Sequence, residues 1–230
     1  MLCVPDDKGH PLASRLAEFI AAADFPCVGA KAALNRDGMR FVAARDFRSG
    51  WDDLRVIPAL LDLARSYRAD PQLFQSLVVI FESGAPDSEE EFERILWRRL
   101  QSLSDKDEWL GQPPDARVAH DPADPHFAMS FGGEAFFVVG LHPKASRPAR
   151  RFAFPAMVFN LHDQFETLRA EGRYDKLRET IIGRDVALAG SANPMLAPHG
   201  TLSAARQYSG RAVDGEWACP FTGRGRRDAA

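Results

Sequence analysis

The segment "FAMSFGGEAFFVVGLHP" (residues 127–143) carries the clearest structural signal in the chain. Two apolar runs flank Gly132-Gly133, and a glycine pair in this position is typical of a tight β-hairpin. The second run, residues 135–141, is apolar throughout, which indicates a strand covered on both faces. Pro143 ends this strand because proline has no backbone N–H to donate. The segment therefore predicts an antiparallel pair of strands with one deeply buried member.

Other segments extend this hairpin into a larger sheet. The apolar runs at 76–82 and 155–160 are typical of buried strands. Residues 25–34 and 39–47 have the pattern of two extended segments, and the turn sequence "NRDG" (35–38) joins them. This arrangement predicts a second hairpin near the N-terminus.

Helices are predicted between and after these strands. Ser88 and Glu91 form a capping-box pattern ahead of an amphipathic segment that reaches Leu103. Pro58 interrupts the helical spacing of residues 51–64, so we expect that helix to kink or to begin late. Asn160 is a candidate N-cap for the next helix. The other helices are predicted at 12–23, 160–168 and 174–188.

The order of these elements predicts an α+β fold, in which helices pack on a mixed, largely antiparallel sheet. We expect a single domain over residues 1–230, with a folded core at about 12–221 and a disordered end at 222–230. After Gly190 the chain has little periodicity, which predicts a loop-rich C-terminal tail. A long tail of this kind in a compact domain commonly packs over a site.

Composition and motifs exclude several functional classes. The chain has 230 residues and a net charge of −3, without the basic excess of a nucleic-acid-binding protein. It has no apolar run of about 18 residues, so no membrane span is expected. Residues 1–10 do not resemble a signal peptide, and we expect a cytoplasmic protein. Cys3, Cys27 and Cys219 lack metal-type spacing, and no phosphate loop, GxSxG or HExxH motif occurs.

A basic loop follows the buried strand. His142 stands at the end of that strand, which is a rigid position for a ligand or a catalytic group. Lys144, Arg147, Arg150 and Arg151 follow it with no acidic residue among them. Arginine pairs well with carboxylates and phosphates, so the loop is a candidate site for a negatively charged group. The alternative is a solvated basic loop beside a histidine that is merely hydrogen-bonded.

Two further groups could bind a metal. His162 and Glu166 lie four residues apart on a predicted helix, and together with His142 they could form a non-heme iron or zinc site. Cys219 precedes Pro220, and such a Cys-Pro pair can present a thiolate to heme iron. The alternative for each is structural: a surface His–Glu pair and a small buried cysteine.

Six motifs, taken in order, resemble the YqcI/YcgG family over roughly residues 25–221. They are "FPCVGAKAAL", "FFVVGLHPKASRPARRF", "MVFNLHDQFETLR", "GSANPML", "QYSGR" and "WACPF". The resemblance implies a heme-dependent N-oxygenase, which hydroxylates a nitrogen of a small guanidine or amine such as arginine.

The resemblance suggests a role for each candidate residue. Non-covalent heme b would take His142 as its iron ligand, with Cys219 as the alternative ligand. The propionates of the heme would pair with three arginines of the basic loop: Arg147, Arg150 and Arg151. Two of the motifs supply the candidate substrate-binding residues: Asn193, Gln207, Tyr208 and Arg211.

The expected partners are a small amine or guanidine and an external electron donor, because no flavin or nicotinamide motif is present. Ala204 and Ala205 stand before "QYSGR", where the family pattern has an acidic residue, so the substrate is expected to differ. Two alternatives stay open: a non-heme metal enzyme that uses His142, His162 and Glu166, and a heme-binding or heme-sensing protein without turnover. The oligomeric state is also open, a homodimer included.

Overall fold

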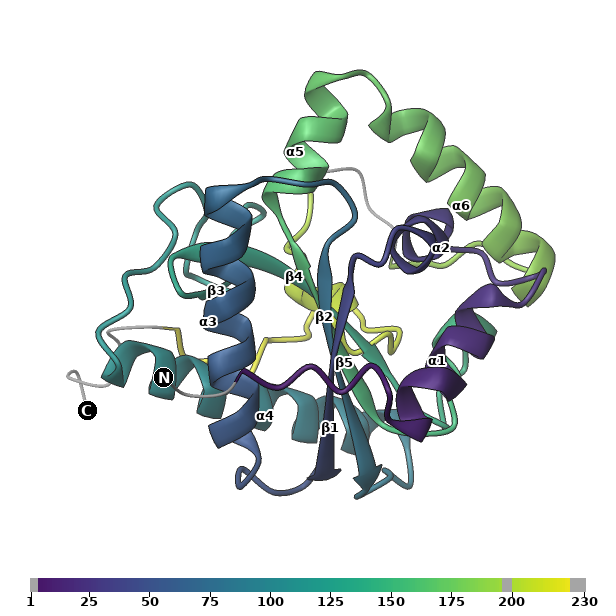
Figure 1. The fold of residues 1–230 in the computed structure, drawn as a ribbon. Coiled ribbons are helices and arrows are strands. Elements are labelled where there is room, and N and C mark those ends of the chain that lie inside the picture. The colour runs from purple at the N-terminus through teal and green to yellow at the C-terminus, as the bar shows by residue number, and fades with distance from the viewer. Residues whose placement is uncertain (1–3, 196–199, 224–230) are drawn as a thin grey trace.

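The computed structural model describes residues 4–195 and 200–223, in which seven α-helices surround one five-stranded sheet (Figure 1). The predicted disordered end lies mostly outside these residues. The strands are β1 (Met39–Asp46), β2 (Ser76–Ser83), β3 (Met129–Phe131), β4 (Glu134–Leu141) and β5 (Ala156–Leu161). The helices are α1 (Pro11–Ala21), α2 (Val28–Asn35), α3 (Asp53–Ala69), α4 (Glu89–Trp109), α5 (Asp163–Ala170), α6 (Tyr174–Ala189) and α7 (Ala205–Tyr208), with a 3-10 turn at Pro148–Arg150.

The sheet has the strand order β1-β2-β5-β4-β3. Only β1 and β2 are parallel, and helix α3 connects them; the other three pairings are antiparallel. The predicted hairpin is confirmed, with Phe131 opposite Glu134 and both glycines between them at positive φ. The α+β class and the largely antiparallel sheet are therefore as the sequence predicts.

The predicted N-terminal hairpin is wrong, because residues 28–35 form helix α2 rather than a strand. Cys27 caps this helix with its side chain, and the alanine-rich sequence behind it favours a helix. The turn at 36–38 ends α2 and leads directly into β1. A side chain at Gly38 would meet the carbonyl oxygen of Phe74 at 2.4 Å, so only glycine fits this close approach.

Three smaller predictions meet different outcomes. The N-cap role of Ser88 is confirmed, since its hydroxyl accepts a hydrogen bond from the Glu91 amide at 3.2 Å. Pro58 lies inside α3, which begins earlier, at Asp53. Asn160 does not cap α5, because β5 continues through Asn160 and the capping position falls on His162.

The sheet separates two apolar cores, as alternate side chains of each strand point to opposite faces. One core lies against α3 and α4 and contains Val79, Phe136 and Phe159. The other lies against α1 and α2 and contains Val78, Leu141 and Ala156. In Figure 1, α3 lies on one side of the strands, while α1, α2 and α6 lie on the other.

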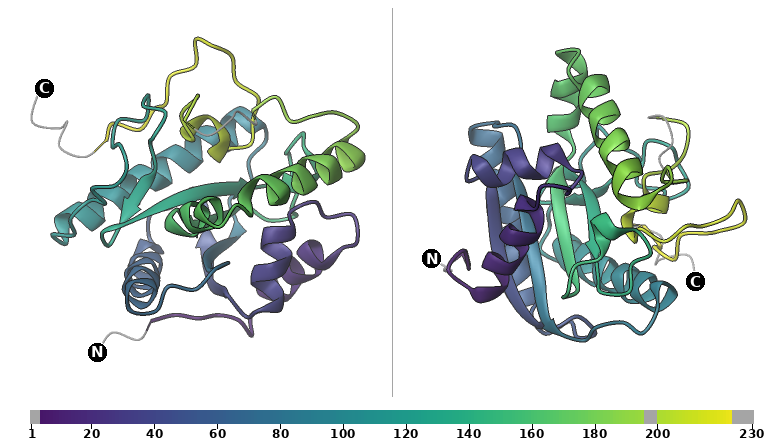
Figure 2. Two further views of the ribbon diagram at one scale, coloured as in Figure 1. Left: turned by 90° about the horizontal axis from the view of Figure 1, so that it is seen from above. Right: turned by 90° about the vertical axis from the view of Figure 1, so that its right-hand side faces the viewer.

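The C-terminal segment is loop-rich as predicted, with α7 as its one helix among the described residues. Because β3 is short and pairs only with residues 134–136, the rest of β4 has no strand on that side. Helix α7 contacts β4, and the Tyr208 hydroxyl donates to the Phe136 carbonyl at 3.1 Å. Figure 2 shows this segment running along the α4 side of the molecule. Among residues 4–195 and 200–223, no helix is long and apolar enough to cross a membrane.

Candidate functional site

A cavity of about 400 Å³ lies on the face of the sheet that carries the second core. Its floor consists of alternate residues of the three central strands, among them Val78, Phe137, Val139 and Val158. Its walls include helices α1, α2, α5 and α6, the turn at 147–150, Asn193 and part of the segment 200–207. Cavities of this size and mainly apolar character are typical of small-molecule or cofactor sites.

Small residues of α2 leave the space that the cavity occupies. Gly29, Ala30 and Ala33 face it from one side, and Leu177 and Ile181 of α6 face it from another. The α6 sequence has no strong apolar face of its own, and Asp185 is the one residue of this helix that is buried. Helix α6 therefore borders an open space instead of packing tightly on the sheet.

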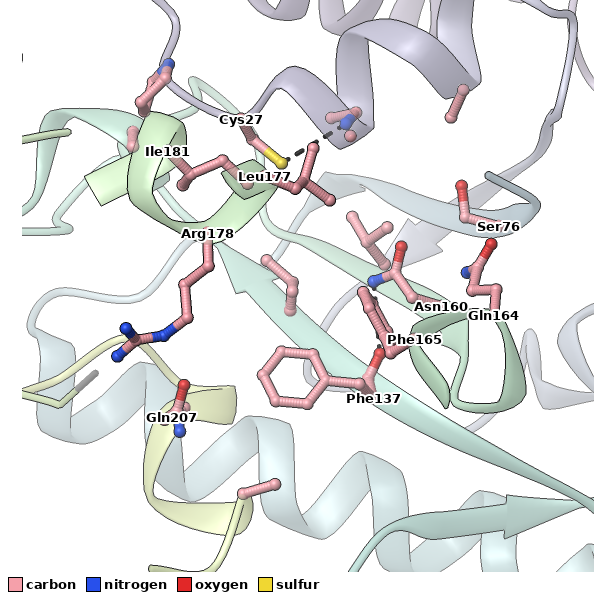
Figure 3. Close-up of a pocket in the computed structure, with 18 of the residues that line it drawn as sticks. Cys27, Ser76, Phe137, Asn160, Gln164, Phe165, Leu177, Arg178, Ile181 and Gln207 are labelled. Atoms are coloured by element: carbon pink, nitrogen blue, oxygen red, sulfur yellow. Dashed lines mark hydrogen bonds between the residues drawn. The ribbon is translucent and has the colours of Figure 1, made fainter. Parts of the chain in front are cut away.

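A group of uncharged polar side chains lies on one side of the cavity (Figure 3). Gln164 exchanges two hydrogen bonds, both 3.0 Å long, with the backbone of Gln75. Asn160 donates from Nδ2 to the Phe137 carbonyl at 3.3 Å. The Ser76 hydroxyl is buried and has no hydrogen-bond partner among the described residues. These groups leave hydrogen-bonding capacity that a ligand can use.

The charged side chains that line the cavity within residues 4–195 and 200–223 are four arginines and one carboxylate, Asp185. Arg147 forms an ion pair with Asp185, and its Nη2 donates to the Ser191 carbonyl at 2.9 Å. Arg150 donates to three carbonyls, those of Gly140, Gln207 and Tyr208, and burial lowers its pKa to about 10.

The other two arginines of the cavity belong to α5 and α6. Arg169 is ion-paired with Glu166 and lies over the ring of Tyr174. Arg178 extends from α6 toward Gln207, and it has no hydrogen bond or ion pair within the described part of the chain (Figure 3).

Cys27 presents its thiol to the cavity from the start of α2 (Figure 3). The sulfur accepts a hydrogen bond from the Ala30 amide at 3.4 Å. Burial raises the pKa of this thiol, while the amides of Ala30 and Gly29 and the charge of Arg150 act to lower it. A thiolate formed there on metal binding would already have backbone N–H groups directed at it.

The predicted iron ligand, His142, lies elsewhere. It is fully buried on the opposite face of the sheet, where its ring stacks on Phe92 with centroids 4.0 Å apart. Neither ring nitrogen has a hydrogen-bond partner among the described residues. Burial, together with the nearby charge of Arg150, lowers the pKa of His142 to about 4, so the imidazole is neutral at pH 7.

The three-residue metal site is contradicted by the strand register. In the antiparallel pair β4–β5, Leu141 lies opposite Ala156 and Leu161 lies opposite Phe136. His142 and His162, which come directly after Leu141 and Leu161, therefore lie at opposite ends of this pair. At 3.4 Å per residue, these ends are about 20 Å apart. His162 itself lines the cavity, with Nε2 3.8 Å from Glu166 Oε1. No group of three or more His, Cys, Asp or Glu side chains among the described residues could hold a metal ion.

Of the remaining predicted residues, some line the cavity and others do not. Arg147, Arg150, Asn193 and Gln207 line the cavity with His162. Four others do not line it: Arg151, Tyr208, Arg211 and Cys219. Arg151 donates to two carbonyls of its own loop, and Arg211 pairs with Glu93. Tyr208 and Cys219 pack in the first core, where burial raises the pKa of the Cys219 thiol to about 12.

The cavity residues that the sequence-based site missed include Cys27, Ser76, Gln164 and Arg178. Cys27 belongs to "FPCVGAKAAL", a segment that already resembled a family motif, and the helix-capping position was the signal available there. Ser76 and Gln164 belong to a predicted strand and a predicted helix, but only the three-dimensional pairing of β2 and β5 brings them together. Nothing in the local sequence distinguishes Arg178 from other surface arginines.

The fold and the cavity define an α+β protein with a small-molecule or cofactor site on one face of its sheet. The chain belongs to the YqcI/YcgG family, whose model matches residues 16–222. It is 28% identical over 165 residues to a Bacillus subtilis (strain 168) protein described as "Uncharacterized protein YcgG". The match covers 69% of this chain and 63% of that relative. No solved structure is significantly similar.

Proposed function

We propose that the protein is a heme-dependent N-oxygenase that binds heme b and a small nitrogen-containing substrate in this cavity. One oxygen atom of O₂ would enter an N–H bond of an amine or guanidine and the other would leave as water. Two electrons and two protons come from an external donor, because the chain has no flavin or nicotinamide motif. The reaction type rests on the family resemblance. The structural observation that carries the proposal is the Cys27 thiol in the wall of a mainly apolar cavity.

The residues of the cavity fit a heme. Aromatic and aliphatic side chains on the sheet, α2 and α6 suit the faces of a porphyrin. Cys27 can supply the iron ligand, since coordination to a metal deprotonates a thiol. Arg147 and Arg150 place positive charge at the cavity, which favours propionates even though both side chains already have protein partners. No CxxCH sequence is present, so the heme would be held non-covalently.

With a thiolate ligand, heme supplies O₂ activation, because the thiolate increases electron density at the iron and favours O–O cleavage. The chain provides the surroundings for this chemistry. Phe137 and Phe165, with ring centroids 6.3 Å apart, give the floor of the cavity an apolar surface. Asn193 and Gln207 line the wall formed by the C-terminal segment and present amide groups for orienting a substrate. We propose that this reaction takes place in the cytoplasm.

An optical spectrum tests the proposal and its ligand. Protein produced with added heme precursor should show a Soret band, and its reduced CO adduct should be strongly red-shifted, as a thiolate ligand requires. Cys27→Ser should abolish this red-shifted adduct. Cys219→Ser should keep it, because Cys219 lies in the core and does not line the cavity.

Several outcomes would contradict the proposal. Folded protein without a Soret band refutes heme binding altogether. An unshifted CO adduct that is lost in His162→Ala or His142→Ala assigns the ligand to that imidazole instead of Cys27. Heme binding without substrate-dependent oxygen consumption, measured with an added reductant, supports a heme sensor and refutes the oxygenase.

A further inference from the structure

The charge of the cavity does not match a cationic substrate. Among the residues that the structure describes, four arginines line it, and Asp185 is the one acidic residue of the lining. Asp185 is already neutralised by its ion pair with Arg147. A guanidinium or ammonium group entering the cavity would therefore meet no unpaired carboxylate in the lining, and it would lose hydration without compensation.

Arg178 differs from the other three arginines of the cavity. Arg147 and Arg169 form ion pairs, and Arg150 donates to three carbonyls. Arg178 has no such partner among residues 4–195 and 200–223, although its guanidinium points to the cavity, toward Gln207 (Figure 3). A guanidinium that faces a cavity without a protein partner is well suited to bind the carboxylate of a ligand, with which it can form two parallel hydrogen bonds.

The other side of the cavity is polar but uncharged. The Ser76 hydroxyl is buried, with 2% of the residue exposed, and has no partner among the described residues. Asn160 and Gln164 lie beside it, and the floor around Phe137 separates this group from Arg178 and Gln207 (Figure 3). An unpartnered buried hydroxyl is costly, and a ligand with an uncharged hydrogen-bonding group would satisfy it.

We propose that the substrate carries a carboxylate, bound by Arg178 with Gln207, and an uncharged nitrogen-bearing polar group, bound near Ser76, Asn160 and Gln164. This inference rests on the proposed function only in placing the substrate in the same cavity. It narrows the substrate class, because it excludes a permanently cationic group at the Ser76 side. A heme propionate is the other possible source of a carboxylate at Arg178, and the experiment separates the two.

Three compounds of nearly equal length test the charge at each end. L-citrulline and L-arginine share the same α-carboxylate and α-ammonium group and differ only in the tail, which is uncharged in citrulline and cationic in arginine. Agmatine has the cationic tail and no carboxylate. Calorimetric titration of the holoprotein should give binding of citrulline that is at least about tenfold tighter than that of arginine, with agmatine weakest. Tighter binding of arginine or agmatine than of citrulline overturns the inference, as does no binding by any of the three.

Variants then assign the contacts. Arg178→Gln should weaken citrulline binding by about tenfold or more, because one charge-assisted pair is lost. Ser76→Ala should weaken it by a smaller factor. Lys176→Gln is the matched control: it removes one positive charge from the same helix, at a residue outside the cavity lining. Equal citrulline affinity in Arg178→Gln and wild type overturns the inference.

A second measurement, titration of the heme-free variants with hemin, shows whether Arg178 binds a heme propionate. If Arg178→Gln weakens hemin binding and leaves citrulline binding unchanged, the carboxylate belongs to heme and the substrate assignment is overturned. If the protein binds citrulline through Arg178 but shows no Soret band, the proposed oxygenase fails while the carboxylate site stands.

Discussion

His142 shows how burial can make a single side chain sensitive to pH. The ring has stacking and apolar contacts but no hydrogen-bond partner among the described residues. Protonation would place a charge in the core close to Arg150, which is also positive. The folded state therefore disfavours the imidazolium, and the pKa falls from its ordinary value near 6.5 to about 4.

We expect His142 to make stability depend on pH between 6.5 and 4. The unfolded chain binds a proton at His142 in this range and the folded chain does not, so the contribution is fully present above pH 6.5 and lost as the pH falls toward 4. The full loss is about 3 kcal/mol. Urea unfolding of His142→Phe, which keeps an aromatic ring against Phe92, should show a smaller fall over this range. An equal fall in variant and wild type would assign the pH dependence to other groups.

At the scale of elements, the helices α3 and α4 are joined by a buried carboxylate. Asp53, in the first turn of α3, is fully buried and forms an ion pair with Arg99 of α4. Its Oδ2 also accepts from the Ser102 hydroxyl at 2.8 Å and lies 3.0 Å from Lys106 Nζ. Burial lowers the pKa of Arg99 to about 10, yet the guanidinium stays charged at neutral pH.

Asp53→Ala should lower the free energy of unfolding by about 3–5 kcal/mol, since it leaves the buried Arg99 without its counter-charge. Urea unfolding at pH 7 measures the effect. Asp62→Ala is the control on the same helix. Its ion pairs with Arg40 and Arg65 are partly solvated, so the loss there should be about 1 kcal/mol or less. Similar losses of unfolding free energy in both variants would show that the buried ion pair contributes no more to stability than the partly solvated ones.

The sequence predicted the elements whose signals are local. The Gly132-Gly133 hairpin and the cap at Ser88 each depend on a few adjacent residues, and both are confirmed. The prediction of an extended segment at residues 25–34 was wrong, because the phenylalanine, valine and leucine there are as compatible with a strand as with a helix. The cap at Cys27 is local, whereas the close approach at Gly38, which leads the chain from α2 into β1, depends on Phe74 in a distant segment.

The cavity was harder to predict than the fold, because it depends on which face each strand turns toward the helices. His142 and Leu141 are adjacent in sequence, yet Leu141 lines the cavity and His142 lies in the opposite core. The basic loop was predicted as a site, and only two of its arginines, Arg147 and Arg150, reach the cavity. The position of Arg178 depends on how α6 packs, which no local pattern specifies.

At the scale of the whole molecule, Arg150 connects the sheet to the C-terminal segment. Its guanidinium donates to the Gly140 carbonyl of β4 and to the Gln207 and Tyr208 carbonyls of α7. Together with the Tyr208 hydroxyl, which donates to the Phe136 carbonyl, this side chain thus holds the last wall of the cavity against β4. The family model, which extends from residue 16 to 222, includes both ends of this connection.

Arg150→Gln should release this wall while the sheet stays folded. We expect cleavage by a non-specific protease to increase several-fold within residues 200–223, because three carbonyls lose their donor. Mass spectrometry of the early fragments locates the cuts. Arg151→Gln is the control, as Arg151 donates only to the Ala145 and Ser146 carbonyls of its own loop. Equal cleavage of the two variants would show that Arg150 does not secure the segment.

The residues that line the cavity are spread along the sequence, from Leu16 to Gln207. A ribosome delivers these residues in order, so the sheet and most helices leave the exit tunnel before the wall that Arg150 holds. Until then, the apolar floor of the cavity is open to water and to chaperones. The cavity is therefore completed only after α7 has been translated, and a molecule bound there, such as the cofactor that we propose, could be enclosed only from that point on.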